Sequence, residues 1–260
     1  MKFSANLTFL YQELPFLDRF AAAARDGFPA VEYMAPYAEP KERIAEILAA
    51  NNLAQALFNV PSGDWDGGER GIAALPGREE EFRAGIANAL DYAAALNCPK
   101  VNVIAGLVTP GADLAAMEAT LVANLKYAAP LCADAGVKLL IEPINLRDMP
   151  GFFLSTTEHA ERILDQVDHP NLYIQYDIYH AQVMRGDLIP TYERLRHRIA
   201  HIQLADTPGR HEPGTGEINW SFVLPEIERL GYDGYIGCEY RPMTTTTAGL
   251  GWLQPFLSNQ

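Results

Sequence analysis

The chain has 260 residues, of which 48% are hydrophobic, so it is long enough to bury one large core and we expect a single domain over residues 1–260. A formal net charge of −13, with no clustered Lys/Arg face, argues against a nucleic-acid partner, whose phosphates need a basic surface. The sequence contains no run of eighteen apolar residues, the length that would suggest a membrane span, and the N-terminus lacks the pattern of a signal peptide. We therefore expect a cytoplasmic protein.

The chain contains three cysteines, Cys98, Cys132 and Cys238, which form no close pair. An odd number without a close pair argues against a disulfide framework and against a thiolate zinc site. We therefore expect all three to be buried packing residues.

Short β-branched or aromatic runs alternate with longer Ala-, Leu- and Glu-rich segments, which is the rhythm of repeated strand–helix units. In chain order, the predicted strands are residues 3–8, 30–34, 54–60, 100–105, 138–142, 173–177, 201–205 and 235–239. The predicted helices are residues 15–26, 41–51, 79–96, 114–134, 158–166, 188–198 and 222–230, with a last segment at 248–257 that closes the ring. Three of the helices are followed by a glycine, Gly27, Gly136 or Gly231, which suits a left-handed C-terminal cap.

Eight strand–helix units in about 250 residues predict an α/β fold, a single (β/α)8 TIM barrel. A doubly wound open sheet is disfavoured because it usually has fewer strands, and because the chain has no GxGxxG or P-loop pattern. The longest irregular stretch, residues 61–77, follows the third predicted strand. We expect it to lie over the C-terminal face of the barrel, where active sites are built.

Four polar residues end four consecutive predicted strands: Glu142, Asp177, Gln203 and Glu239. In a barrel they would face one cavity, where buried acids are costly unless they are paired or bind a cation. One such acid alone is more often a helix N-cap or an ion-pair partner. Four on consecutive units favour a metal site, and carboxylate and amide oxygens are hard ligands suited to Mg²⁺ or Mn²⁺. The lack of His or Cys in this set argues against zinc.

Several stretches carry a family resemblance, among them Gly63-Asp64-Trp65, Ile141-Glu142-Pro143-Ile144-Asn145 and Gln175-Tyr176-Asp177-Ile178-Tyr179-His180, with residues 68–73, 76–82 and 212–219. On these the chain resembles the hydroxypyruvate isomerase branch of the xylose-isomerase-like TIM barrel family. The resemblance implies a divalent metal held by Glu142, Asp177, Gln203 and Glu239, with Glu142 and Glu239 also transferring protons. Many members of the wider family carry a histidine on the seventh strand, where this chain has Gln203.

The activity that the resemblance implies is the interconversion of hydroxypyruvate and tartronate semialdehyde (2-hydroxy-3-oxopropanoate). This reaction moves a carbonyl between adjacent carbons through an enediolate, so one proton leaves C3 and another arrives at C2. A metal chelated by the substrate oxygens would acidify the C–H bond, and two carboxylates on opposite sides of the planar intermediate would serve as base and acid. Which glutamate takes the first proton stays open.

The expected substrate is a small anionic keto acid, whose carboxylate needs a cationic clamp. Arg70 on the long loop is the first candidate and Arg210, after the seventh strand, is the second, with a surface ion pair as the alternative for either. We expect His180 to hydrogen-bond a substrate oxygen, or else to be a structural histidine. Asn59, at the end of the third strand, would orient substrate oxygens or form a turn.

Three other functions remain as alternatives. A related isomerase or epimerase would use the same metal and acids on another keto acid or ketose, such as 2-oxo-tetronate. A metal-dependent nucleic-acid hydrolase on a related barrel is disfavoured, because it would gather histidines around zinc beside a basic groove, whereas the six histidines here are scattered. A non-catalytic sugar-acid binding protein would not need both intact glutamates. The sequence also leaves open whether the chain forms a homo-oligomer.

Overall fold

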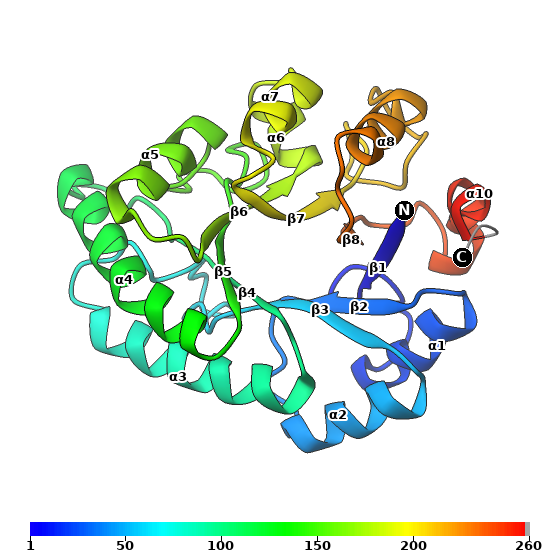
Figure 1. Ribbon diagram of the computed structural model, residues 1–260, viewed down its shortest axis with the longest axis horizontal. Helices are drawn as coiled ribbons and strands as arrows, with labels where there is room; N and C mark the ends of the chain where they lie inside the picture. The colour runs from blue at the N-terminus through cyan, green and yellow to red at the C-terminus, as the bar shows by residue number, and fades with distance from the viewer. Residues whose placement is uncertain (258–260) are drawn as a thin grey trace.

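The computed structural model describes residues 1–257, and in it eight parallel strands close into a barrel in chain order (Figure 1). The strands are β1 (Lys2–Asn6), β2 (Ala30–Tyr33), β3 (Ala54–Asn59), β4 (Lys100–Val103), β5 (Lys138–Ile141), β6 (Leu172–Asp177), β7 (Ile199–Leu204) and β8 (Tyr235–Cys238). Because β8 pairs with β1, the sheet has no free edge. The predicted (β/α)8 barrel is confirmed, and strand boundaries differ from the prediction by at most two residues.

Helices surround this barrel on the outside, as Figure 1 shows. They are η1 (Phe16–Asp18), α1 (Arg19–Arg25), α2 (Lys41–Ala50), α3 (Glu79–Leu96), α4 (Leu114–Asp134), α5 (Thr157–Val167), α6 (Ile178–Met184), α7 (Leu188–Leu195), α8 (Trp220–Arg229), α9 (Thr246–Gly249), η2 (Leu250–Leu253) and α10 (Gln254–Leu257). The three predicted capping glycines all have positive φ, as expected. The final segment, expected as one helix, is divided into α9, η2 and α10.

Helix α6 is absent from the sequence prediction. Its seven residues follow β6 without an intervening turn, and its N-cap, Asp177, is itself the last residue of the strand. A strand that passes directly into a short helix leaves no Gly or Pro punctuation to separate the two elements. The structure therefore adds a helix at the place where the site is built.

Strand β1 shows how the two-residue period of a strand separates the inside of the barrel from the outside. Phe3 packs against Trp252 and Phe256 near the C-terminus, with ring centroids 5.5 Å apart in both pairs. Ser4 and Asn6 instead hydrogen-bond to the same buried side chain within the barrel. Apolar residues thus hold the helices, while a polar row rises inside the barrel towards its mouth.

That buried side chain is Glu32 on β2, which is fully shielded from solvent. It reaches past β1 and β8 to β7, where His201 Nε2 lies 2.9 Å from its Oε2. Gly237 on β8 provides the space, because a Cβ added there would overlap the carboxylate of Glu32. The barrel therefore encloses a charged group below its mouth.

The three cysteines are buried as predicted.

No helix among residues 1–257 is both long enough and apolar enough to cross a membrane.

Replacing Gly237 with Ala tests the placement of Glu32. We expect Gly237→Ala to lower the free energy of unfolding by about 1–3 kcal/mol, because the new methyl group overpacks the interior. Gly85→Ala is the matched control: its added Cβ would have no neighbour closer than 3.5 Å, and alanine should stabilise helix α3 by about 0.5–1 kcal/mol. Urea unfolding measures both, and a Gly237→Ala protein as stable as the wild type would contradict the placement.

Candidate active site

Three of the predicted strand-end residues are acids that converge at the mouth of the barrel. Glu142 follows β5 directly, Asp177 ends β6 and Glu239 follows β8 directly, and all three side chains are buried. Together with His180 of α6, each offers a possible ligand atom, and these atoms all lie within 4.8 Å of one another. The carboxyl ends of three strands therefore bring together residues that are up to 97 positions apart, as the numbers 142 and 239 show.

The two carboxylate oxygens of Asp177 make separate contacts. Its Oδ1 accepts a hydrogen bond of 2.8 Å from the backbone N–H of Tyr179 and so caps α6. Its Oδ2 faces the cluster, 3.3 Å from Arg210 Nη2 and 3.4 Å from His180 Nε2. The N-cap contact and the position in the cluster are compatible, because the cap fixes the direction of the second oxygen.

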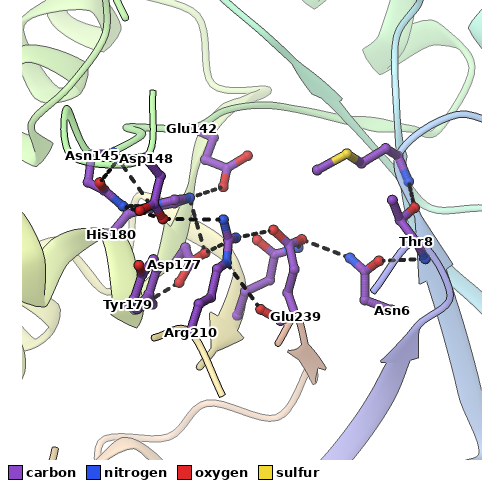
Figure 2. A network of polar contacts seen from close by, with 12 residues as sticks. Asn6, Thr8, Glu142, Asn145, Asp148, Asp177, Tyr179, His180, Arg210 and Glu239 are labelled. Atoms are coloured by element: carbon purple, nitrogen blue, oxygen red, sulfur yellow. Dashed lines mark hydrogen bonds and ion pairs between the residues drawn. The ribbon is translucent and has the colours of Figure 1, made fainter. Parts of the chain in front are cut away.

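Arg210 is the cation of the cluster. Figure 2 shows its guanidinium between Glu239 and the pair formed by Asp177 and His180. Arg210 Nη2 pairs with Glu239 Oε1, and the guanidinium carbon lies 4.7 Å and 5.0 Å from the ring centroids of Phe9 and Tyr179. Both rings lie within cation–π distance of the guanidinium, while its Nη2 pairs with the carboxylates of Asp177 and Glu239. The second of the two predicted clamp residues is therefore in the site.

Burial makes the acids of this cluster resist ionisation. It raises the pKa of Glu142 to about 8, an effect to which the charge of Asp177 adds. Burial also raises the pKa of Asp177 and of Glu239, although Arg210 opposes the shift in both. Carboxyl groups with raised pKa values at neutral pH are the kind that transfer protons in enzymes.

His180 is held in one tautomer by its neighbour Asn145. The backbone N–H of Asp148 donates to Asn145 Oδ1 at 2.8 Å, so the Nδ2 of Asn145 is the end that faces His180 Nδ1, at 2.6 Å. An amide nitrogen can only donate, so Nδ1 accepts and the ring proton is on Nε2. Burial, with the charge of Arg210, lowers the pKa of His180, which keeps the ring neutral. Its Nε2–H therefore points at the acids as a hydrogen-bond donor.

Two asparagines connect Glu142, which follows β5, to the two preceding strands, β4 and β3. Asn102 on β4 donates to Glu142 Oε2 at 3.0 Å and to Asn59 Oδ1 at 3.2 Å. Asn59 lines the cavity beside the acids, as its position at the end of β3 predicted. Its carbonyl oxygen is thus used by Asn102, and its side-chain NH₂ group is left for a ligand.

Gln203 lies beside Glu239 and presents its nitrogen to it. Gln203 Nε2 donates to Glu239 Oε2 at 2.6 Å, and Gln203 Oε1 accepts from Gln175 Nε2 at 2.7 Å. Asn6, at the end of β1, also donates to Glu239 Oε2, at 2.7 Å. Gln203 is in the site where it was predicted, with its amide oxygen turned to Gln175.

Arg70 lies away from the acids. Its Nη1 donates to the carbonyl oxygens of Trp65 and Glu69 at 2.8 Å and 2.7 Å, and its guanidinium stacks 4.4 Å from the ring centroid of Trp65. It is therefore used to hold the long loop after β3. The loop does lie over the mouth, since Trp65 lines the cavity. The sequence ranked Arg70 above Arg210, and the structure favours Arg210.

The cavity at the cluster is small, about 30 Å³, and it is lined by Glu142, His180 and Arg210 among others. A second cavity of about 600 Å³ adjoins it, since both are lined by Met34, Asn59 and Trp65. The site thus has a tight polar end and a wider chamber beside it. Trp65 lines both spaces, so the long loop after β3 borders the route between them.

The donor set fits a hard divalent cation. Three buried carboxylates offer oxygen atoms within reach of one ion, and their mutual repulsion is what such an ion would relieve. His180 fits less well as a ligand, because the nitrogen that faces the acids carries the proton. The set of Glu142, Asp177 and Glu239 is therefore the basis for a metal site.

The chain matches the model of the xylose isomerase-like TIM barrel family over residues 20–256. It is 50% identical to the 2-oxo-tetronate isomerase of Cupriavidus necator over 256 residues, covering 98% of both chains. It is also 50% identical to the hydroxypyruvate isomerase of Escherichia coli, covering 98% of this chain and 99% of the other. The chain belongs to the xylose isomerase-like TIM barrel family. It is an enzyme, an isomerase of the type that these two relatives represent.

Solved structures share the barrel fold of this chain. A structure described as an AP endonuclease, family 2, from Brucella melitensis has a TM-score of 0.96 and 44% identity, with 98% of both chains covered. The 3-keto-D-glucoside 4-epimerase from Escherichia coli has a TM-score of 0.81 at 18% identity, covering 97% of this chain and 98% of the other, which shows the fold alone. The barrel is shared across these proteins.

Metal binding should stabilise the folded protein. For chelator-treated protein, Mg²⁺ or Mn²⁺ at 100 times Kd should add about 2.7 kcal/mol to the free energy of unfolding, seen as a higher Tm. Asp177→Asn should lose most of this gain, although asparagine still caps α6. Asp113→Asn is the control, because Asp113 caps α4 outside the site. An equal gain in Asp177→Asn and wild type would rule out this ligand set.

Proposed function

We propose that the chain interconverts hydroxypyruvate and tartronate semialdehyde through an enediolate, with Glu142 and Glu239 as the two proton-transferring groups. The observation that carries the proposal is the convergence of these two buried carboxyls, from the ends of β5 and β8, in one cluster with Asp177. An isomerisation of this kind needs one group that removes a proton and one that returns it. Two carboxyls with raised pKa values supply both.

A divalent ion, Mg²⁺ or Mn²⁺, is part of the proposal. Glu142, Asp177 and Glu239 would hold it, with Gln203 as a fourth ligand through Oε1, and when bound it would polarise the substrate oxygens and stabilise the charge that develops on them. For Gln203 this requires Oε1 to exchange its hydrogen bond with Gln175 for the cation. The nitrogen of the same amide would stay on Glu239.

The remaining side chains bind and orient the substrate. Arg210 would pair with the substrate carboxylate, since its guanidinium already lies at the acids, beside the rings of Phe9 and Tyr179. His180 would donate Nε2–H to a substrate oxygen, and Asn59 would donate its NH₂ group from the opposite wall. The Trp65 loop would exclude water from the enediolate. Arg70 would support this loop through its contact with Trp65.

The second candidate substrate is 2-oxo-tetronate. It is favoured by the chamber of about 600 Å³ next to the acids, which has room for a fourth carbon, and by the equal identity to relatives of both names. The chemistry at the acids would be the same for both substrates. Hydrolysis of nucleic acid is not supported, because the net charge is −13 and the cluster holds one histidine.

Glu239→Gln and Glu142→Gln should each lower kcat by at least about 100-fold, because each removes one partner of the proton transfer. Both variants should keep the fold, since glutamine has nearly the same volume as glutamate. Glu118→Gln is the control, a carboxylate that contacts His159 and Gln166 and belongs to neither the acid cluster nor the cavity lining. Turnover is followed by the conversion of hydroxypyruvate to tartronate semialdehyde, and a wild-type rate in Glu239→Gln would disprove the assigned roles.

A substrate panel distinguishes the two candidates. Wild-type protein should isomerise hydroxypyruvate, lose activity with chelator and regain it when Mg²⁺ or Mn²⁺ is added back. Turnover of 2-oxo-tetronate with none on hydroxypyruvate would assign the chain to the second substrate. Activity that is untouched by exhaustive chelation would remove the metal from the proposal.

A further inference from the structure

We propose that Glu32, buried below the mouth of the barrel, is a positioning residue for Glu239 that acts through the side-chain amides of Asn6 and Gln203. The inference rests on the proposed role of Glu239 in proton transfer. Glu32 does not line the cavity and does not contact the three acids directly. No sequence pattern identified it.

The two amides bridge two carboxylates. Asn6 Nδ2 donates to Glu32 Oε1 at 3.2 Å and to Glu239 Oε2 at 2.7 Å. Gln203 Nε2 donates to the same two atoms, at 2.8 Å and 2.6 Å. One oxygen of Glu32 and one oxygen of Glu239 thus share a pair of NH₂ groups between them.

Each bridging NH₂ group is fully used, because an amide nitrogen has only two hydrogens to donate. The other end of each amide is also engaged. Asn6 Oδ1 accepts from the backbone N–H of Thr8 at 3.0 Å, and Gln203 Oε1 accepts from Gln175. Rotating either amide by half a turn would place a carbonyl oxygen against two carboxylates. Glu32 therefore helps to fix which end of both amides faces Glu239.

Glu32 is itself fixed on its other oxygen. Ser4 Oγ and His201 Nε2 donate to Oε2 at 2.6 Å and 2.9 Å. Lys100 Nζ lies 3.2 Å from His201 Nδ1, so the imidazole connects the buried carboxylate to a cation. Burial alone would raise the pKa of Glu32, but His201 and the hydrogen bonds lower it, so the group is a carboxylate that only accepts.

The consequence for Glu239 is that its two oxygens are not equivalent. Oε2 accepts from both amides, whereas Oε1 pairs with Arg210, which lines the cavity as Glu239 does. One oxygen is held for orientation and the other is left for proton transfer. Loss of Glu32 would remove one of the acceptors that orient both amides and would let them shift together with the Glu239 carboxylate, a small displacement that costs about 100-fold in rate in positioned reactions.

The test compares Glu32→Leu, Glu32→Gln and Ser4→Ala in the metal-loaded enzyme. Glu32→Leu removes the acceptor for both amides and should lower kcat by about 100-fold with KM changed less than about threefold. Glu32→Gln keeps one oxygen for the amides but loses the charge that strengthens both hydrogen bonds, so it should keep between about a tenth and a third of wild-type kcat. Ser4→Ala, the matched control, removes a donor on the Oε2 side and should keep kcat within about twofold of wild type.

Thermal unfolding separates this role from a structural one. A buried ionic group replaced by an apolar one often leaves stability unchanged, so Glu32→Leu is expected to fold. A Glu32→Leu protein with wild-type kcat would overturn the proposal, and so would a Ser4→Ala protein with the same loss as Glu32→Leu. If Glu32→Leu does not fold, Glu32→Gln decides, with kcat below that of Ser4→Ala supporting the proposal and equal values overturning it.

A double-mutant cycle with Asn6→Ala tests the route. Because Glu32 acts partly through Asn6, Glu32→Leu should lower kcat less in the Asn6→Ala background than in the wild type. Additive losses would overturn the route through Asn6. Failure of this inference is distinct from failure of the proposed function: an active Glu239→Gln enzyme would refute the function, whereas an inactive Glu239→Gln beside a fully active Glu32→Leu would refute only the positioning role.

Discussion

The structure depends on one electrostatic conflict, the burial of three carboxyl groups within a few ångströms of one another at the mouth of the barrel. Glu142, Asp177 and Glu239 are all shielded from water, and their pKa values are raised by that burial. Desolvated like charges are costly unless a cation or a shared proton offsets them. Arg210 supplies one positive charge, and the geometry of the three oxygens suits a second from a divalent ion.

The barrel brings the three acids together because each lies at the end of a strand. Parallel strands deliver side chains from distant parts of the chain to one face, and the short helix α6 adds His180 and fixes Asp177 through its cap. A second polar layer lies beneath. There Glu32 occupies the space left by Gly237 and holds two amides against Glu239. The site is therefore supported from inside the barrel as well as from its loops.

The sequence predicted the barrel well because strand and helix periodicities are local properties. The strand-end acids followed from the fold, since the fold decides which residues reach the mouth. Glu32 and Asn145 could not be found in this way. Glu32 is in the middle of a strand, where an isolated acid has no distinctive pattern, and its partners are 28 and 169 residues away. Asn145 acts on His180 across 35 residues.

The ranking of the two arginines shows the same limit. Loop length and position made Arg70 the first candidate, but whether a loop side chain turns towards the mouth depends on contacts within that loop. Here the ring of Trp65 and two carbonyl oxygens hold Arg70, while Phe9 and Tyr179 hold Arg210 at the acids. Such aromatic contacts are settled by packing and leave no trace in spacing or composition.

The most direct test is to locate a cation bound by the three acids at the mouth of the barrel. Crystals grown with Mn²⁺ and measured near the manganese absorption edge should show one anomalous peak within about 2.0–2.5 Å of oxygens from Glu142, Asp177 and Glu239. The absence of a peak there at saturating Mn²⁺, or a peak that contacts only one of the three acids, would contradict the account.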